Sequence, residues 1–168
     1  VRLDYTVPSR GLIGFRSEFM TITRGLGLMY HTFQRYADRA QAKIGERANG
    51  VLVSIAAGKS LAYALFNLQA RGRLFIGPSE QVYEGMVIGI HSRSGDLVVN
   101  PLKAKQLTNI RAAGSDENIV LTPPLELTLE TAIEFINDDE LVEVTPTAIR
   151  VRKKLLREHE RKRAARAA

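Results

Sequence analysis

The sequence has 168 residues, a formal net charge of +6, a pI near 9.8 and no cysteine. The lack of cysteine excludes a disulfide framework and a thiolate metal site. With 45% hydrophobic residues the chain can bury a core, but we find no signal peptide and no apolar run that could span a bilayer. The basic balance indicates an acidic partner, either nucleic acid or a membrane surface. Because the chain opens on Val1 without an initiator Met, we expect a piece of a longer protein.

The charge falls into three blocks along the chain. Residues 1–114 carry 15 Lys and Arg against 7 Asp and Glu, and residues 115–149 carry 9 acidic residues and no Lys or Arg. Residues 150–168 carry 9 Lys and Arg against 2 Glu. Because an acidic block separates two basic ones, the folded chain can present two distinct anion-facing surfaces.

The first part of the chain predicts a strand, a helix and a second strand. Residues 2–7 alternate apolar and polar side chains, and residues 12–22 place apolar ones at helical spacing. Residues 28–36 are rich in aromatic side chains and favour a strand. This order is typical of half a split βαβ unit. The Asn49-Gly50 turn signal then closes a polar stretch that we interpret as a domain boundary.

The following residues predict a mostly β region with two short helices. Helices are expected at 61–69 and after Thr128, a plausible N-cap that precedes Glu130 in the first turn. Strands are expected at 51–55, 73–76, 82–83, 86–90 and 119–121, with an antiparallel pair at 140–144 and 148–152. The tail from Lys153 predicts either a basic helix or a disordered arm.

A long basic loop is expected after the strand at residues 86–90. Between His91 and Gly114 it carries three spaced cations, Lys103, Lys105 and Arg111, and only Asp96 opposes them. Lys and Arg supply salt-sensitive attraction to phosphate, while amides and hydroxyls fix the register on sugar and base. The alternative is a solvated loop whose cations only keep the protein soluble.

Enzymatic motifs are weak in this sequence. Gly58-Lys59-Ser60 follows a strand, but a phosphate-binding P-loop needs glycine where the chain has Val53. Lys59 is then an exposed turn cation at a helix start. His91, Ser92 and Asp96 supply the residue types of a hydrolase triad, but triads are assembled across a fold rather than within one loop. A hydrolase that uses His91 and Ser92 remains the competing enzyme class.

Metal-binding patterns are also weak. The three histidines lie on different predicted elements, without ligand spacing. The run Asp138-Asp139-Glu140 could hold Mg²⁺ or Ca²⁺, but it lacks a glycine-kinked series of ligands. We interpret this run as a solvated helix end.

The tail carries the densest basic cluster in the sequence. Like-charge blocks at a terminus commonly bind nucleic acid. A membrane-surface helix is the competitor, but its last turns offer only alanine where Trp, Phe or Leu would have to insert. The tail therefore favours RNA or DNA over a membrane.

Long motifs in a fixed order cover nearly the whole chain. The first is PSRGLIGFRSEFMTITRG at Pro8–Gly25. The others lie at Ala64–Gln69, Arg71–Gly77, Val82–Arg93, Asp96–Lys103, Asp138–Pro146 and Ile149–Lys153. Together they resemble the TypA/BipA family of translational GTPases, and the first resembles the later part of the fifth domain that this family shares with elongation factor G.

The resemblance implies an α+β fold in three parts. Residues 1–38 would be the end of a ferredoxin-like α/β sandwich domain. Residues 39–152 would be the mostly β C-terminal domain peculiar to this family, with short helices and one long basic loop, and residues 153–168 a basic tail. GTP hydrolysis, with its GTP and Mg²⁺, would belong to a domain outside this sequence. This piece would then be no enzyme and hold no cofactor of its own.

The resemblance also implies a role on the ribosome. Members are linked to large-subunit assembly and to stress or cold adaptation, and the long loop would reach A-site tRNA. The expected partners are large-subunit rRNA, A-site tRNA and the protein's own GTPase domains, with no membrane, a cytoplasmic location and a monomeric state. The alternative is a regulatory module that packs on the GTPase without touching RNA. The predicted RNA contacts are His91, Arg93, Asn100, Lys103, Lys105, Gln106, Asn109 and Arg111, with Arg150, Arg152, Lys153 and Lys154 before the tail.

Overall fold

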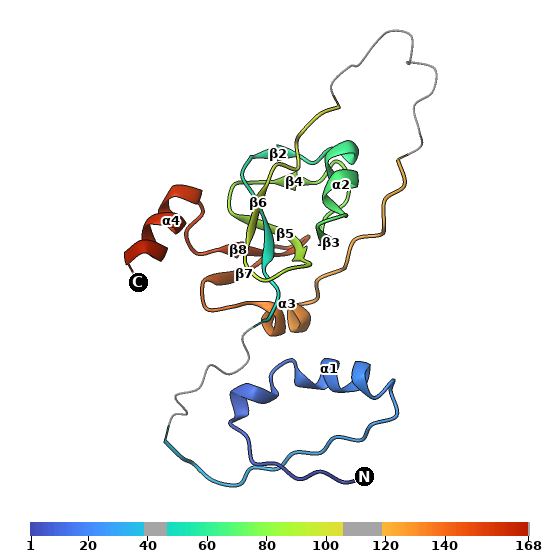
Figure 1. Ribbon diagram of the computed structural model, residues 1–168, viewed down its shortest axis with the longest axis vertical. Coiled ribbons are helices and arrows are strands. Elements are labelled where there is room, and N and C mark those ends of the chain that lie inside the picture. The colour runs from blue at the N-terminus through green and yellow to red at the C-terminus, as the bar shows by residue number, and fades with distance from the viewer. Residues whose placement is uncertain (39–46, 106–118, 168) are drawn as a thin grey trace. The chain divides into compact units, whose positions relative to one another are not determined.

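The structure is a computed structural model that describes residues 1–38, 47–105 and 119–167 (Figure 1). The chain divides into two compact units, Val1–Arg47 and Ala48–Ala168. Both helices and strands are present, so the fold is α+β as predicted. Among the described helices, none has the length and apolar character needed to cross a membrane.

The first unit contains a 3₁₀ helix, η1 (Ser9–Leu12), and one α-helix, α1 (Phe15–Ile22). The helix confirms the prediction from apolar spacing at residues 12–22. The strands predicted at residues 2–7 and 28–36 were wrong, because the described residues of this unit contain no strand. A strand needs a neighbour for its backbone N–H and C=O groups. Neither segment has a strand partner among the described residues, and Tyr30 is 86% exposed.

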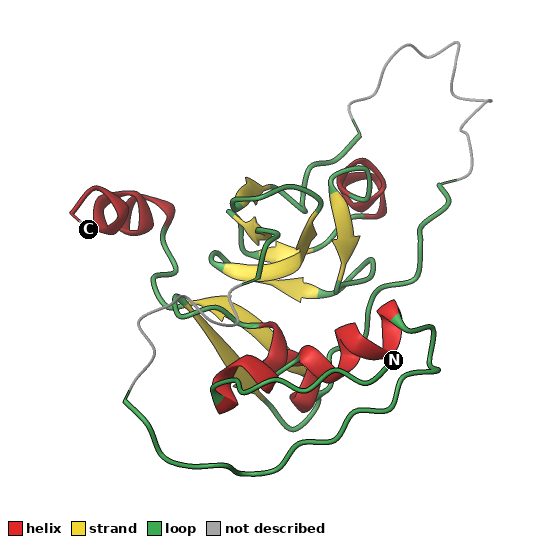
Figure 2. Ribbon diagram, turned by 60° about the horizontal axis from the view of Figure 1, so that its bottom comes forward, coloured by secondary structure: helices red, strands yellow, loops and turns green. Residues whose placement is uncertain are grey.

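The second unit is built on a six-stranded sheet whose strand order is β6-β1-β5-β8-β7, with β3 also paired to β5 (Figure 2). The β1–β6 pair is parallel and the others are antiparallel. A separate two-stranded sheet joins β2 and β4. The strands are β1 (Val51–Ser54), β2 (Gly58–Lys59), β3 (Gly72–Leu74), β4 (Gln81–Val82), β5 (Met86–His91), β6 (Leu97–Val99), β7 (Glu140–Val144) and β8 (Ile149–Lys153).

Three helices accompany this sheet: α2 (Ala62–Leu68), α3 (Leu129–Phe135) and α4 (Glu158–Ala167). Thr128 is the N-cap of α3 as predicted, because its hydroxyl accepts from the Thr131 backbone N–H and Thr131 returns the bond in a capping box. The predicted β7–β8 pair is confirmed. The strand expected at residues 119–121 is not formed.

Two apolar clusters pack on the sheet. Leu65 of α2 joins one cluster and Ala132 of α3 joins the other. Side chains alternate along β1, so that Leu52 enters the first cluster while Val51 and Val53 enter the second. The chain from Val51 to Val53 therefore fixes which face of the sheet each helix covers.

The long basic loop predicted from Ser92 to Asp116 is not a loop throughout. Residues 92–96 form a tight turn, and β6 then pairs in parallel with β1 and ends at the buried Val99. The sequence does not predict β6, because its three apolar residues, Leu97, Val98 and Val99, lie within a mostly polar stretch. The cationic loop, defined here as residues 103–119, begins only after β6.

Candidate nucleic-acid interface

The turn Ser92–Asp96, called the pinned turn below, is held by backbone bonds from both sides. The Gly50 N–H donates to the Arg93 carbonyl, and the Ser92 N–H and hydroxyl both donate to the Arg71 carbonyl, each at 2.9 Å. A Cβ on Gly50 would lie 1.9 Å from the Gly95 carbonyl oxygen, so this close approach requires glycine. The predicted contact Arg93 is therefore an exposed cation on a rigid turn.

The same bonds separate the residues of the hydrolase alternative. His91 Nδ1 lies 2.8 Å from the Gly95 carbonyl, and the Ser92 hydroxyl donates to Arg71. Asp96 accepts from the Val51 N–H at 3.0 Å and contacts Lys153. A nucleophile must hydrogen-bond to its base, and the base to its orienting acid. These contacts give each side chain a different structural partner, so the geometry does not support a triad.

Lys153, one of the predicted RNA contacts, is 2% exposed. Its Nζ lies 2.5 Å from Asp96, 2.7 Å from Asp139 and 2.9 Å from Glu140. Burial disfavours the charged ammonium, but the hydrogen bonds to Asp139, Asp96 and Glu140 outweigh burial and raise the pKa of Lys153 above its ordinary value. The Lys153 ammonium is therefore not available to bind a phosphate.

The acidic partners of Lys153 correct two further expectations. Asp96 was expected to oppose the loop cations, but it belongs to the Lys153 cluster. Glu140 was expected at a solvated helix end, but it is buried at the start of β7 and accepts from the Asn137 N–H at 3.1 Å. In the described part of the chain, no group of three His, Asp or Glu residues is arranged to hold a metal ion.

The start of the cationic loop is anchored next to the first residues of α2. The Leu61 N–H donates to the carbonyl of the buried Pro101 at 3.0 Å. Leu102 packs on the apolar cluster of α2, and its N–H donates to the Asn100 side-chain oxygen at 2.9 Å. The Asn100 side-chain oxygen, predicted to contact RNA, thus accepts a hydrogen bond that stabilises the turn at residues 100–102. Lys103 and Lys105 follow with exposed side chains.

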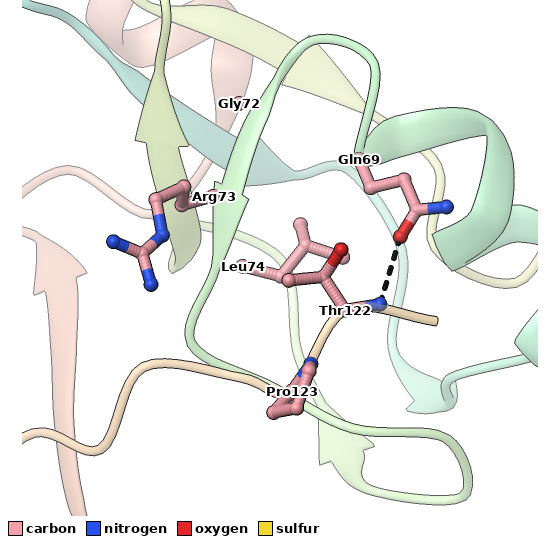
Figure 3. Close-up of a pocket in the computed structure, with 6 residues that line it drawn as sticks. All are labelled: Gln69, Gly72, Arg73, Leu74, Thr122 and Pro123. Atoms are coloured by element: carbon pink, nitrogen blue, oxygen red, sulfur yellow. Dashed lines mark hydrogen bonds between the residues drawn. The ribbon is translucent and has the colours of Figure 1, made fainter. Parts of the chain in front are cut away.

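The return of the cationic loop is anchored at the other end of α2. The Gln69 side chain donates to the Val120 carbonyl and accepts from the Thr122 N–H, both at 3.1 Å. Figure 3 shows the bond from Thr122. Between them Leu121 packs on the same apolar cluster as Leu102. The predicted contacts Gln106, Asn109 and Arg111 lie outside the described residues, between these two anchors in sequence.

Gly58-Lys59-Ser60 contributes to this framework and not to a phosphate loop. Gly58 and Lys59 form β2, and the buried Ser60 hydroxyl donates to the Gly77 carbonyl at 2.7 Å. A Cβ on Gly58 would lie 2.5 Å from the Leu102 side chain, so β2 packs directly against the start of the loop. Lys59 is exposed as predicted, but it lies in strand β2 and not in a turn.

Arg150 and Arg152 lie half-buried on β8. Arg150 is opposite Glu143 on β7, and the Tyr83 hydroxyl donates to the same Glu143 carboxylate. Burial, followed by this hydrogen bond and the negative charge of Glu143, raises the pKa of Tyr83 well above its ordinary value. These two predicted contacts therefore face a polar cluster of the sheet, whereas Lys154 is exposed.

The tail forms the helix α4, which projects from the end of β8 (Figure 1). Its start is tied down, because the Glu158 N–H donates to Glu84 at 3.3 Å and the Arg161 guanidinium donates to the carbonyls of Leu155 and Leu156. A hydrogen bond from Lys162 lowers the pKa of Glu158. Of the two structures predicted for the tail, a basic helix or a disordered arm, the described residues form the helix. His159, Arg163 and Arg166 share one exposed helical face.

The predicted contacts therefore fall into separate groups. His91 ends β5 and Arg93 lies in the pinned turn before β6, whereas Asn100, Lys103 and Lys105 follow the end of β6. Sequence reasoning missed Arg71, whose side chain is exposed and whose carbonyl holds Ser92 of the pinned turn. In the sequence, the glycine between Arg71 and Arg73 could have indicated a close backbone contact here. In the structure, a Cβ on Gly72 would lie 1.8 Å from the Ile90 carbonyl oxygen.

Both parts of the chain match known protein families. The family described as "Elongation factor G C-terminus" matches residues 1–47, so the first unit is similar to the end of a translation factor. The description "TypA/BipA C-terminal domain" matches residues 49–158. The chain belongs to the TypA/BipA family.

Curated relatives agree with this assignment. The chain is 63% identical over 167 residues to the large ribosomal subunit assembly factor BipA of Escherichia coli K12. It is 62% identical over 166 residues to the protein of the same name from Haemophilus influenzae. Each match covers 99% of this chain but only 28% and 27% of the relative, so the chain spans little more than a quarter of their length.

Proposed function

We propose that this region binds RNA on the large ribosomal subunit and thereby helps to anchor a GTPase there. The observation that carries the proposal is the cationic loop, which starts with the exposed Lys103 and Lys105 and is anchored at both ends of α2. The name of the relatives, which describes assembly of the large ribosomal subunit, supports the choice of partner.

The proposed mechanism separates attraction from positioning. Lys103, Lys105 and Arg111 neutralise phosphates, which gives a salt-dependent affinity. Gln106 and Asn109 hydrogen-bond to sugar or base edges, and Arg93 on the pinned turn and Lys154 add charge elsewhere on the unit. Proteins recognise structured RNA largely through its shape and 2′-hydroxyls, so we expect low sequence specificity.

The finer parts of the proposal concern the longer protein. Its GTPase domain, with GTP and Mg²⁺, lies outside this sequence, and the cationic loop contacts rRNA and the acceptor end of A-site tRNA. The protein acts in the cytoplasm as a monomer, in large-subunit assembly and in stress or cold adaptation. The role in large-subunit assembly is supported by the name of the relatives, and the other statements extend the family resemblance of the sequence.

The test is binding of the chain to isolated large ribosomal subunits across a salt series. The variant Lys103→Ala/Lys105→Ala/Arg111→Ala should weaken binding and flatten the salt slope by about one per lost phosphate contact. A control variant, Arg2→Ala/Arg16→Ala/Arg35→Ala, removes the same charge from exposed side chains of the first unit. Equal losses in both variants would attribute binding to net charge and overturn the loop assignment.

A second comparison ranks the loop against the tail. Truncation after Arg157 removes α4 but keeps Lys153 and its ion pairs, which an earlier cut would destroy. If only this truncation weakens binding, α4 holds the RNA. If neither variant weakens binding, both the loop and the tail assignments are wrong. If the wild type itself does not bind, the region is a module that packs on the GTPase without RNA contact, which is the second candidate function.

A further inference from the structure

We infer that Gln69 is a positioning residue for RNA binding, because it sets the register in which the cationic loop returns to the domain. The inference rests on the function proposed above and adds a neutral residue that no charge pattern would select. Gln69 is the C-cap residue of α2, where the helix has ended and the side chain can reach the neighbouring segment. Figure 3 shows its amide directed at the backbone of Thr122.

The Gln69 amide acts as a strand edge would. Its nitrogen donates to the Val120 carbonyl and its oxygen accepts from the Thr122 N–H, both at 3.1 Å. A β-strand offers its neighbour this combination of one donor and one acceptor. The segment 120–122 is not assigned to a strand, but its burial alternates as in one, with Leu121 half-buried between the exposed Val120 and Thr122. A side chain thus replaces the strand partner that this segment lacks in the described residues.

These two bonds decide which side chain enters the core. Leu121 lies between the two bonded residues and packs on the apolar cluster of α2, while Val120 is 72% exposed. In an extended segment, a slip of one residue turns the opposite side chains inward. Without Gln69, a slip of one residue brings Val120 to the cluster in place of Leu121 and leaves one residue fewer in sequence between Leu102 and the cluster.

Both anchors depend on the same helix. Leu102 at the start of the loop and Leu121 at its return pack on one cluster with Leu65 and Leu68 of α2. The next backbone anchor after Thr122 is the bond from the Leu125 N–H to the Leu74 carbonyl at 2.8 Å. The entropy of closing a loop changes only slowly with its length. The effect of losing Gln69 is therefore expected in the orientation of the loop more than in the stability of the fold.

The test uses this chain and isolated large ribosomal subunits. Gln69→Ala removes both bonds, and Gln69→Glu keeps the acceptor but sets a carboxylate against the Val120 carbonyl. Asn67→Ala is the matched control, because Asn67 lies on the same helix and its side chain donates to the Tyr63 carbonyl one turn earlier. We expect both Gln69 variants to weaken binding about fivefold to tenfold, the equivalent of about one net hydrogen bond, and the control to bind as the wild type does.

Two further readouts separate positioning from a general structural role. The salt slope of Gln69→Ala should equal that of the wild type, because this substitution changes no charge and leaves the phosphate-contacting cations in place. The thermal midpoint should fall by no more than about 4 °C, the effect of about 1 kcal/mol, while the Thr122 amide should exchange its hydrogen at least tenfold faster. A larger fall in the midpoint with faster exchange throughout the second unit would reduce Gln69 to a stabilising residue and overturn the inference.

The outcomes distinguish this inference from the proposed function. If the wild type binds and Gln69→Ala binds equally well, the positioning role is wrong and the RNA-binding proposal stands. If the wild type shows no saturable binding, the proposed function fails, and the role of Gln69 in RNA binding fails with it.

Discussion

The pinned turn and the cationic loop both carry predicted RNA-contacting cations, but the fold holds them by different means. In the pinned turn, Arg93 accepts a backbone hydrogen bond from Gly50, and Ser92 donates to the Arg71 carbonyl. Asp96 of the turn accepts from the Val51 N–H and pairs with Lys153. The described ends of the cationic loop are held by apolar packing of Leu102 and Leu121 and by side-chain bonds. A cation on the turn is therefore fixed by the backbone of the sheet, whereas the cations of the loop depend on anchors at its ends.

Because of this difference, different substitutions should disturb the cation of the turn and the cations of the loop. Substitutions that damage the sheet or the Lys153 cluster should disturb Arg93 together with stability. Substitutions at the loop anchors should disturb RNA binding while leaving stability nearly intact, because these anchors lie at one edge of the core. The following predictions test that contrast.

The largest effect is expected from Lys153→Met. The substitution leaves Asp96, Asp139 and the buried Glu140 without their shared cation. Removing one partner of a buried ion pair typically costs about 3–5 kcal/mol. We expect a loss of this size in the free energy of unfolding, measured by urea denaturation. Lys154→Met at the exposed neighbouring position is the control, and equal losses in both variants would show that the cluster contributes nothing.

A smaller loss is expected from Gly50→Ala in the contact that holds the pinned turn. The new Cβ would lie 1.9 Å from the Gly95 carbonyl oxygen, so the backbone must shift. Overpacking of this kind costs about 1–3 kcal/mol. Urea denaturation of Gly50→Ala should show this loss, while Ser94→Ala, an exposed change in the same turn, should stay within about 0.5 kcal/mol of wild type. Unchanged stability in Gly50→Ala would mean that the turn is not held rigidly.

A pH-dependent effect is expected on the alkaline side. The pKa values of Lys153 and Tyr83 are both raised in the folded state, so the folded protein binds more protons than the unfolded chain above about pH 10. Their contribution is fully present below the unfolded pKa values and is lost as the pH rises toward the folded ones. We expect the free energy of unfolding to fall above about pH 10.

Tyr83→Phe separates the two groups in that experiment. Removing the hydroxyl deletes its hydrogen bond to Glu143 and should cost about 1 kcal/mol at neutral pH. The alkaline fall should then be less steep, because only Lys153 still contributes. An unchanged alkaline slope in Tyr83→Phe would contradict the raised pKa of Tyr83.

The smallest effect on stability is expected from Lys103→Ala/Lys105→Ala. Both side chains are exposed at the start of the cationic loop, and exposed substitutions usually change stability by less than about 0.5 kcal/mol. We expect a thermal midpoint equal to that of wild type, together with weaker binding to large ribosomal subunits. A large drop in the midpoint would show that these cations belong to the fold and would remove the contrast with the pinned turn.

Sequence alone determined most local elements of the second unit. Apolar patterns gave β1, β5, α2 and the β7–β8 pair, because period-2 and helical spacing are local properties. The capping pattern gave the start of α3 at Thr128. Family motifs placed the chain in the TypA/BipA family, which both the family match at residues 49–158 and the curated relatives support.

Only the tertiary structure decided what each polar residue contacts. Lys153 resembles its exposed neighbour Lys154 in sequence, but three carboxylates from distant positions surround it. The aromatic segment 28–36 has strand-like composition, but no described neighbour pairs with it. Gln69 gave no signal at all, because its role depends on a backbone more than fifty residues away. Pairing, burial and ion contacts arise between residues far apart in the chain, so local pattern cannot specify them.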